Sequence, residues 1–174
     1  YLCYMRQDVA FNPGEAVSQR IIGRLLAERF DAVVTVDPHL HRVATLAEAV
    51  PAATAVALSA AALFGAYLQE REPGALLVGP DEESAQWLAA ATRDHRFETA
   101  VCRKLRRGDR DVSIDIPDAD LTGRAVVLVD DMASTGTTLA VAARRCLERG
   151  AATVDVLVVH GLFVGDAVAD LRRA

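Results

Sequence analysis

Residues 126–139 read VVLVDDMASTGTTL. A run of apolar residues is followed by two aspartates, by hydroxyl residues around Gly136, and by the start of a periodic stretch. This order predicts a buried strand, a tight loop and a helix. Such a loop directs backbone N–H groups and the positive end of the helix dipole at one point, which suits a phosphate group.

The side chains of this segment fit the same ligand. Gly136 allows a close approach of the backbone. Asp130 and Asp131, expected at the carboxyl end of the strand, can accept hydrogen bonds from sugar hydroxyls or hold Mg²⁺ through water. The segment predicts a site for a phosphorylated sugar, although an ordinary strand end with a threonine helix cap is the alternative. The hydroxyl donors are Ser134, Thr135, Thr137 and Thr138.

The composition is that of a packed protein. The 174 residues weigh 18.6 kDa and are 52% hydrophobic, which allows one mid-sized domain or two small ones. The 19 basic residues against 24 acidic ones give a net charge of −5. This balance provides no general attraction for nucleic acid or an anionic membrane, so neither is expected as a partner.

Cysteine usage and hydropathy favour a reduced, cytoplasmic setting. Cys3, Cys102 and Cys146 lie far apart and form no zinc or CxxC spacing. Residues 49–69 carry no charge, but small residues dominate them, so we expect a strand at 54–58 and a helix from about Ser59 instead of a membrane span. Secretory features are absent, and because Tyr1 is not Met we expect the chain to lack its own N-terminus.

Strand-like runs alternate with helical stretches along the chain. An apolar stripe of Val17, Ile21 and Leu25, with Ile22 and Leu26, predicts one helix, a second follows Asp81, and a third covers about 138–148. The alternation predicts an α/β fold with mainly parallel sheets flanked by helices. Residues 32–37 (AVVTVD) resemble residues 125–130 (AVVLVD), which is weak support for two related halves joined near 54–59. Besides the strand at 54–58, strands are expected at 32–36, 75–78, 99–103, 125–129 and 153–159.

Further motifs extend the picture beyond the phosphate loop. Residues 4–15 read YMRQDVAFNPGE, residues 36–41 read VDPHLH, residues 102–106 read CRKLR, and residues 160–163 read HGLF. With the loop at 126–139, these motifs resemble the ribose-phosphate pyrophosphokinase family of the phosphoribosyltransferase superfamily, in its archaeal-type branch. Ser134 is a departure, because many members carry an acidic residue there. His41 and Arg42 also differ from many relatives.

The resemblance implies a type I phosphoribosyltransferase fold and a reaction. Residues 1–57 would be the remainder of an incomplete N-terminal domain on the ATP side, and residues 58–174 a related C-terminal domain. The diphosphoryl group of Mg-ATP would pass to the anomeric hydroxyl of ribose 5-phosphate, giving 5-phosphoribosyl diphosphate (PRPP) and AMP for nucleotide biosynthesis. Active sites at subunit borders would make the protein a homo-oligomer.

Individual roles follow from the same resemblance. Arg6, Gln7, Asp8 and His39 would bind ATP, and His39 and Asp81 would bind Mg²⁺. Lys104 and Arg106 would be catalytic, on a loop that closes over the reacting phosphates and stabilises their charge. Ribose 5-phosphate would be bound by Asp130, Asp131, Ser134, Thr135, Gly136, Thr137 and Thr138.

Plainer interpretations accompany each motif. The RQD segment could be an exposed turn, His39 a hydrogen-bonded loop residue, Asp81 a helix cap, and residues 103–111 a solvated charged run with Gly108 inside it. Two other functions also fit the phosphate loop: a PRPP-dependent phosphoribosyltransferase, and a non-catalytic regulatory relative of PRPP synthetase. The first would not need the RQD, DPH and KxR motifs together, and the second would be expected to lose some of them.

Overall fold

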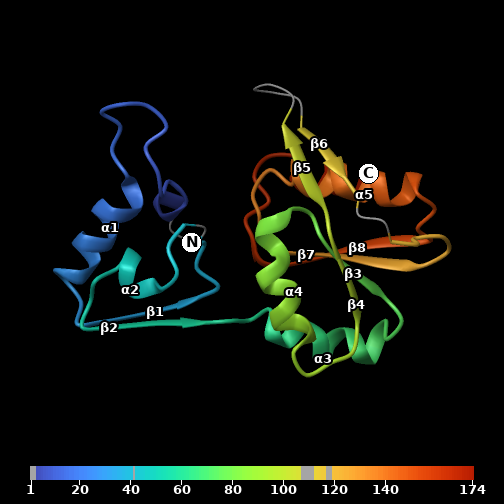
Figure 1. Ribbon diagram of the computed structural model, residues 1–174, viewed down its shortest axis with the longest axis horizontal. Helices are drawn as coiled ribbons and strands as arrows, with labels where there is room; N and C mark the ends of the chain where they lie inside the picture. The colour runs from blue at the N-terminus through green and yellow to red at the C-terminus, as the bar shows by residue number, and fades with distance from the viewer. Residues whose placement is uncertain (1–2, 41, 107–111, 117–118) are drawn as a thin grey trace. The chain divides into compact units, whose positions relative to one another are not determined.

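The computed structural model describes residues 3–40, 42–106, 112–116 and 119–174 of the chain. It divides into two compact units, Tyr1–Ala60 and Ala61–Ala174, which we call unit 1 and unit 2 (Figure 1). No helix in the described part of the chain is both long and apolar enough to cross a bilayer.

Unit 2 is built on a parallel sheet with the strand order β4-β3-β7-β8 (Figure 1). The central strand β7 pairs with β3 on one side and β8 on the other, with Val126 opposite both Leu76 and Val154. The parallel pairing and the flanking helices confirm the predicted fold class. The four strands are β3 (Leu76–Gly79), β4 (Glu98–Val101), β7 (Ala125–Ala133) and β8 (Thr153–Gly161).

Helices cover both faces of this sheet, as a parallel sheet requires. Side chains alternate along each strand, so Leu128 packs with helix α5 (Thr137–Glu148), whereas Val127 packs with α3 (Ala62–Arg71) and α4 (Ala85–Thr92). All side chains of β3 are buried, which explains its unbroken apolar sequence. The chain ends in α6 (Ala167–Arg173).

The strand expected at 99–103 is two strands. The strand is interrupted at Cys102, whose N–H donates to the Gly79 carbonyl at 2.8 Å. Strand β5 (Arg103–Arg106) then pairs antiparallel with β6 (Val112–Asp115). The hairpin was not predicted, and residues 107–111 between its strands, with Gly108, lie outside the described residues.

Unit 1 contains the parallel pair β1 (Ala32–Val36) and β2 (Thr54–Leu58), both at their predicted positions. Its small core is formed by Leu46, Ala49 and Val50. The predicted helix is present as α1 (Ser18–Ala27), and two short elements were not predicted, a 3-10 turn at Cys3–Arg6 and α2 (Leu46–Ala49).

The buried face of α1 differs in part from the predicted one, although Leu26 of the predicted stripe packs against the small core. Ile21 and Leu25 are 55% and 47% exposed, whereas Gln19 and Gly23 are buried. Gly23 lies against the chain at Ala49 so closely that a Cβ atom would come within 1.8 Å of the Ala49 carbonyl oxygen. The close approach of two backbones, which hydrophobic periodicity does not encode, selects the face that is buried.

Helices α3 and α4 pack so closely at Gly65 that a larger residue there should lower stability. A Cβ atom on Gly65 would lie 2.1 Å from the Ala91 carbonyl oxygen and 2.5 Å from the His95 ring. We expect Gly65→Ala to lower the free energy of unfolding by about 1–3 kcal/mol, measured by urea denaturation. Gly74→Ala is the matched control, since its Cβ would enter open space. Equal stability of the two variants would contradict this packing.

Candidate functional site: the loop between β7 and α5 and two loops of unit 1

The phosphate loop joins β7 to α5 in unit 2. Gly136 is the N-cap of α5 and has a φ of 71°, a left-handed conformation that glycine adopts without strain. The Gly136 carbonyl accepts the first helical hydrogen bond, from Ala140 N–H at 2.8 Å. The loop therefore turns sharply and leaves the first N–H groups of a twelve-residue helix available for an anion.

Neighbouring segments hold the loop in place. The Ser134 carbonyl accepts a hydrogen bond from Val164 N–H at 2.9 Å, and the Ala133 carbonyl accepts from Leu162 and Phe163 at 3.0 and 3.1 Å. The hydroxyls of Thr135 and Thr137 lie 3.0 Å apart. The HGLF segment of the sequence thus supports the loop from the end of β8.

The two aspartates lie inside β7, not after it. The strand was expected to end at residue 129, but its pairing with β8 continues to Ala133, opposite Gly161. Successive strand residues face opposite sides of a sheet, and accordingly Asp131 is buried while Asp130 is partly exposed. Asp130 Oδ1 also accepts the Asp131 N–H at 2.9 Å.

Asp130 is in an environment that disfavours its negative charge. Burial, together with the nearby charges of Asp131 and Asp81, raises the pKa of its carboxyl to about 8. The site therefore concentrates carboxylates at the end of the sheet where α/β proteins bind ligands. A sugar hydroxyl or a cation at Asp130 would relieve this unfavourable arrangement.

Asp81 has a structural role as well. Its Oδ1 accepts the Glu83 N–H at 3.2 Å, so Asp81 caps the 3-10 turn Glu82–Ser84. The buried Ser84 hydroxyl donates to the Asp81 carbonyl at 2.5 Å. The interpretation of Asp81 as a cap is confirmed. The Asp81 carboxylate also raises the pKa of Asp130.

The raised pKa of Asp130 predicts a pH-dependent stability. An unfolded aspartate has a pKa of about 3.9, so between pH 4 and pH 8 the folded protein retains a proton that the unfolded chain loses. The free energy of unfolding of the ligand-free protein should fall across this range, by several kcal/mol. Asp130→Asn should flatten the curve, whereas Asp155→Asn, at an exposed position on β8, should not. Superimposable curves for the wild type and Asp130→Asn would contradict the assignment.

The carboxylates of Asp81 and Asp130 suit Mg²⁺ only when a bound substrate supplies further ligands. Among the described residues, no group of three His, Cys, Asp or Glu side chains is arranged to hold a metal ion alone. Mg²⁺ commonly binds through one or two carboxylates together with substrate phosphates and retained waters. The carboxylates here fit that mode, in which the substrate completes the site.

In unit 1, the RQD segment is held against the start of α1. Gln7 Oε1 accepts from the Ser18 N–H at 2.9 Å and from the Ser18 hydroxyl at 2.5 Å, and Gln7 Nε2 donates to the Ala16 carbonyl. The Gln7 amide therefore anchors α1, which lacks a side-chain cap at Val17. Arg6, next to it, is exposed.

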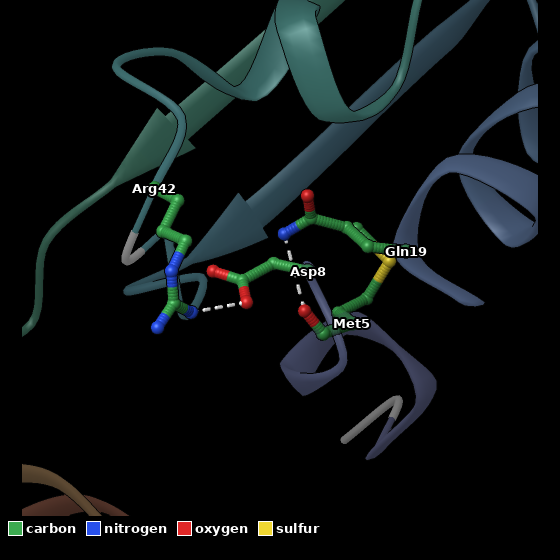
Figure 2. Close-up of polar contacts among 4 residues, drawn as sticks. All are labelled: Met5, Asp8, Gln19 and Arg42. Atoms are coloured by element: carbon green, nitrogen blue, oxygen red, sulfur yellow. Dashed lines mark hydrogen bonds and ion pairs between the residues drawn. The ribbon is translucent and has the colours of Figure 1, made fainter. Parts of the chain in front are cut away.

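Asp8 joins this segment to the loop that follows β1. Figure 2 shows Arg42 directed at the Asp8 carboxylate, with 2.5 Å between Arg42 Nη1 and Asp8 Oδ1. On the other side, the buried Gln19 amide donates to the Met5 carbonyl at 3.1 Å (Figure 2). Met5 and Leu40 pack on the same small core, so the two loops that the sequence assigned to ATP lie together in unit 1.

The loop that carries His39 is anchored by Asp37. Asp37 is buried and has a φ of 39°, which is uncommon for a residue with a side chain. Its carboxylate accepts from the Ser59 hydroxyl at 2.7 Å and from Ala60 N–H at 2.6 Å. His39, two residues later, is partly buried and itself makes an interaction within the chain.

Lys104 and Arg106 lie on β5, where their backbones pair with Ile114 and Val112. The described structure extends to their backbones only. Lys104 and Arg106 therefore lie on a strand and not in the predicted loop. The rest of that predicted loop, residues 107–111, and His41 lie outside the described residues.

Comparison with known proteins assigns the family. The family model for the phosphoribosyl transferase domain matches residues 19–167. The chain belongs to this family. It is 38% identical to a ribose-phosphate pyrophosphokinase of Methanopyrus kandleri, over 98% of this chain and 58% of the relative, and 34% identical to ribose-phosphate pyrophosphokinase 2 of Archaeoglobus fulgidus, over 100% of this chain and 62% of the relative.

A solved structure agrees on the fold. Phosphoribosylpyrophosphate synthetase from Mycobacterium smegmatis matches with a TM-score of 0.80 and 24% identity, over 97% of this chain and 54% of that chain. The phosphoribosyltransferase-type fold and the archaeal resemblance are thus confirmed. This chain spans about three fifths of the length of the curated relatives.

The structure assembles the predicted residues in two groups. In unit 2, the charge of Asp81, which follows β3, acts on Asp130 of β7, the strand that leads into the phosphate loop. Arg6, Gln7 and Asp8 lie with the loop after β1 in unit 1. The roles of Asp37 and Arg42 were not predicted, because each depends on a partner far away in the sequence.

Proposed function

We propose that this protein is a ribose-phosphate diphosphokinase, which makes PRPP and AMP from ATP and ribose 5-phosphate. The observation that carries the proposal is the extent of the similarity: relatives named ribose-phosphate pyrophosphokinase match 98% or more of this chain, and therefore unit 1 as well as unit 2. A phosphate loop alone would fit many members of the family. The addition of the unit 1 loops favours a second, nucleotide substrate.

Unit 2 is proposed to bind ribose 5-phosphate. The 5-phosphate would accept hydrogen bonds from the N–H groups at the start of α5 and from the hydroxyls of Thr135, Thr137 and Thr138. Asp130 and Asp131 would accept hydrogen bonds from the ribose 2- and 3-hydroxyls. Protonation of free Asp130 below pH 8 would make sugar binding improve as the pH rises toward that value, because the charged carboxylate is the stronger acceptor.

Unit 1 is proposed to bind ATP. Arg6 is exposed and can approach a phosphate or the adenine face. Gln7 and Asp8 would act mainly by holding the loop, since their side chains are engaged by Ser18 and Arg42. His39 is assigned to the nucleotide and its metal ion by resemblance, on a loop that Asp37 fixes to residues 59 and 60.

The proposed reaction is a single diphosphoryl transfer. The anomeric hydroxyl oxygen of ribose 5-phosphate bonds to the β-phosphorus of ATP, the bond from that phosphorus to the α–β bridging oxygen breaks, and AMP leaves with the electron pair. The hydroxyl proton is released. Lys104 and Arg106 would stabilise the negative charge that spreads over the transferring oxygens, and catalysis of this kind rests on positioning and electrostatics. His39 would hold the Mg²⁺ ion of ATP and Asp81 a second Mg²⁺ ion, each together with substrate phosphates, and the bound ions would neutralise phosphate charge.

The setting is proposed to be the cytoplasm, with the protein acting as a homo-oligomer. A PRPP-dependent phosphoribosyltransferase is the second candidate, since it would use the same unit 2 loop. The test is to incubate the protein with Mg²⁺, ATP and ribose 5-phosphate and to quantify AMP and PRPP. Equal amounts of both support the proposal. Absence of AMP, with base-dependent consumption of added PRPP, would replace it by the transferase.

A further inference from the structure

The ion pair between Arg42 and Asp8 places a cation between the RQD segment and the loop that follows β1. Asp8 has a side chain only 2% exposed, whereas the Arg42 side chain is 47% exposed. The carboxylate thus faces the interior and the guanidinium faces solvent (Figure 2). This asymmetry distinguishes the pair from a surface salt bridge, in which both partners are solvated.

Arg42 has unused hydrogen-bonding capacity. A guanidinium has five N–H donors, and Nη1 donates to Asp8. Within the described part of the chain, no other acceptor is recorded for Arg42. Fixing one edge of the group with a buried carboxylate leaves other N–H donors directed outward in a defined orientation, which is the geometry that binds phosphate oxygens in pairs.

The surroundings favour an anion at this position. Exposed Arg6 lies two residues before Asp8 on the same segment, and Arg42 follows the loop that carries His39. Asp8 offsets one of these two positive charges and is itself shielded from solvent. Two exposed arginines thus belong to this pair of loops, on a backbone that Gln7 and Gln19 hold in place.

We infer that Arg42 is a further nucleotide-binding residue, held in position by Asp8, which contacts the polyphosphate of the nucleotide. The inference rests on the proposed function, because it assigns the nucleotide to unit 1. Asp8 is then a positioning residue whose effect on the nucleotide is transmitted through Arg42. Preorganisation by the ion pair lowers the entropic cost of ordering a long side chain when the phosphates bind.

The test measures binding of ATP, AMP and adenosine by isothermal titration calorimetry, without ribose 5-phosphate, so that it is independent of catalysis. Arg42→Gln should weaken ATP binding about tenfold, AMP less, and adenosine not at all, since only the phosphates lose a charged hydrogen bond. Arg42→Lys keeps the charge and should show a smaller loss for ATP. Asp8→Asn should show the same dependence on phosphate number.

Controls separate this role from a structural one. Arg20→Gln removes an exposed arginine from α1 in the same unit and should bind all three ligands as the wild type does. Ribose 5-phosphate affinity should be unchanged in every variant. Three results would each overturn the inference. They are unchanged ATP affinity in Arg42→Gln, an equal loss of affinity for adenosine and ATP in Arg42→Lys, and a wild type that binds no ATP. If the wild type binds ATP and the Arg42 and Asp8 variants lose affinity according to the number of phosphates, but the wild type releases no AMP when ribose 5-phosphate is added, only the proposed reaction is refuted.

Discussion

Replacing Lys104 by alanine should reduce the rate of PRPP formation by at least about a thousandfold, because one cation placed on transferring phosphoryl oxygens can supply three to five powers of ten in rate. The substitution removes charge stabilisation that is needed in the transition state, so kcat should fall while the KM for ribose 5-phosphate changes little. Steady-state measurement of AMP release, with each substrate varied in turn, gives both constants.

The neighbouring Arg103 provides a matched control on the same strand. Arg103 is exposed and pairs through its backbone with Asp115 at the other end of the hairpin. Arg103→Ala removes one positive charge from β5 and should leave kcat within a few-fold of the wild type. Equal losses in Arg103→Ala and Lys104→Ala would indicate a general electrostatic effect of the hairpin and would count against the specific role of Lys104. Arg106→Ala should resemble Lys104→Ala.

The second large effect is expected at the phosphate loop. Gly136→Ala introduces a side chain at a φ of 71°, where its Cβ would also meet Leu171 at 3.4 Å. Left-handed backbone costs a residue with a side chain about 1–2 kcal/mol, and the loop can avoid this cost only by changing shape. A changed loop misdirects the N–H groups at the start of α5, so we expect the Kd for ribose 5-phosphate to rise between ten- and a hundredfold, or about 1.4–2.8 kcal/mol.

Gly123→Ala controls for the backbone strain. Gly123 has a φ of 68°, and its Cβ would meet no atom within 4 Å. Both variants should therefore lose a similar part of their stability in urea denaturation, whereas only Gly136→Ala should lose affinity for ribose 5-phosphate, measured by calorimetry. If Gly123→Ala weakened the sugar phosphate equally, the loss would reflect global destabilisation and not the geometry of the loop.

Periodic patterns predicted most of the regular structure. Strands β1 and β2 lie where β-branched runs indicated them, and α5 begins one residue before its predicted start. These elements could be predicted because residues that are neighbours in the sequence determine them. The end of β7 was less predictable, because the strand continues through Asp130 only where β8 pairs with it. The acidic residues gave no local signal of that pairing.

Contacts between distant residues account for what was missed. The buried face of α1 is set by the approach of Ala49 to Gly23, and not by the apolar stripe of Ile21 and Leu25. The break at Cys102 depends on Gly79, a residue of another strand. In the candidate site, the phosphate loop could be predicted as one continuous motif, whereas the link from Asp8 to Arg42 could not.

Diphosphoryl transfer from ATP to ribose 5-phosphate is tested most directly by following the β-phosphorus of ATP. ATP labelled at that position is incubated with the protein, Mg²⁺ and ribose 5-phosphate, and the nucleotides and sugar phosphates are separated. We expect the label to appear in PRPP, in an amount equal to the AMP formed, and AMP to carry none of it. Label retained in ADP, with an unlabelled sugar phosphate product, would show transfer of a single phosphoryl group and would contradict diphosphoryl transfer.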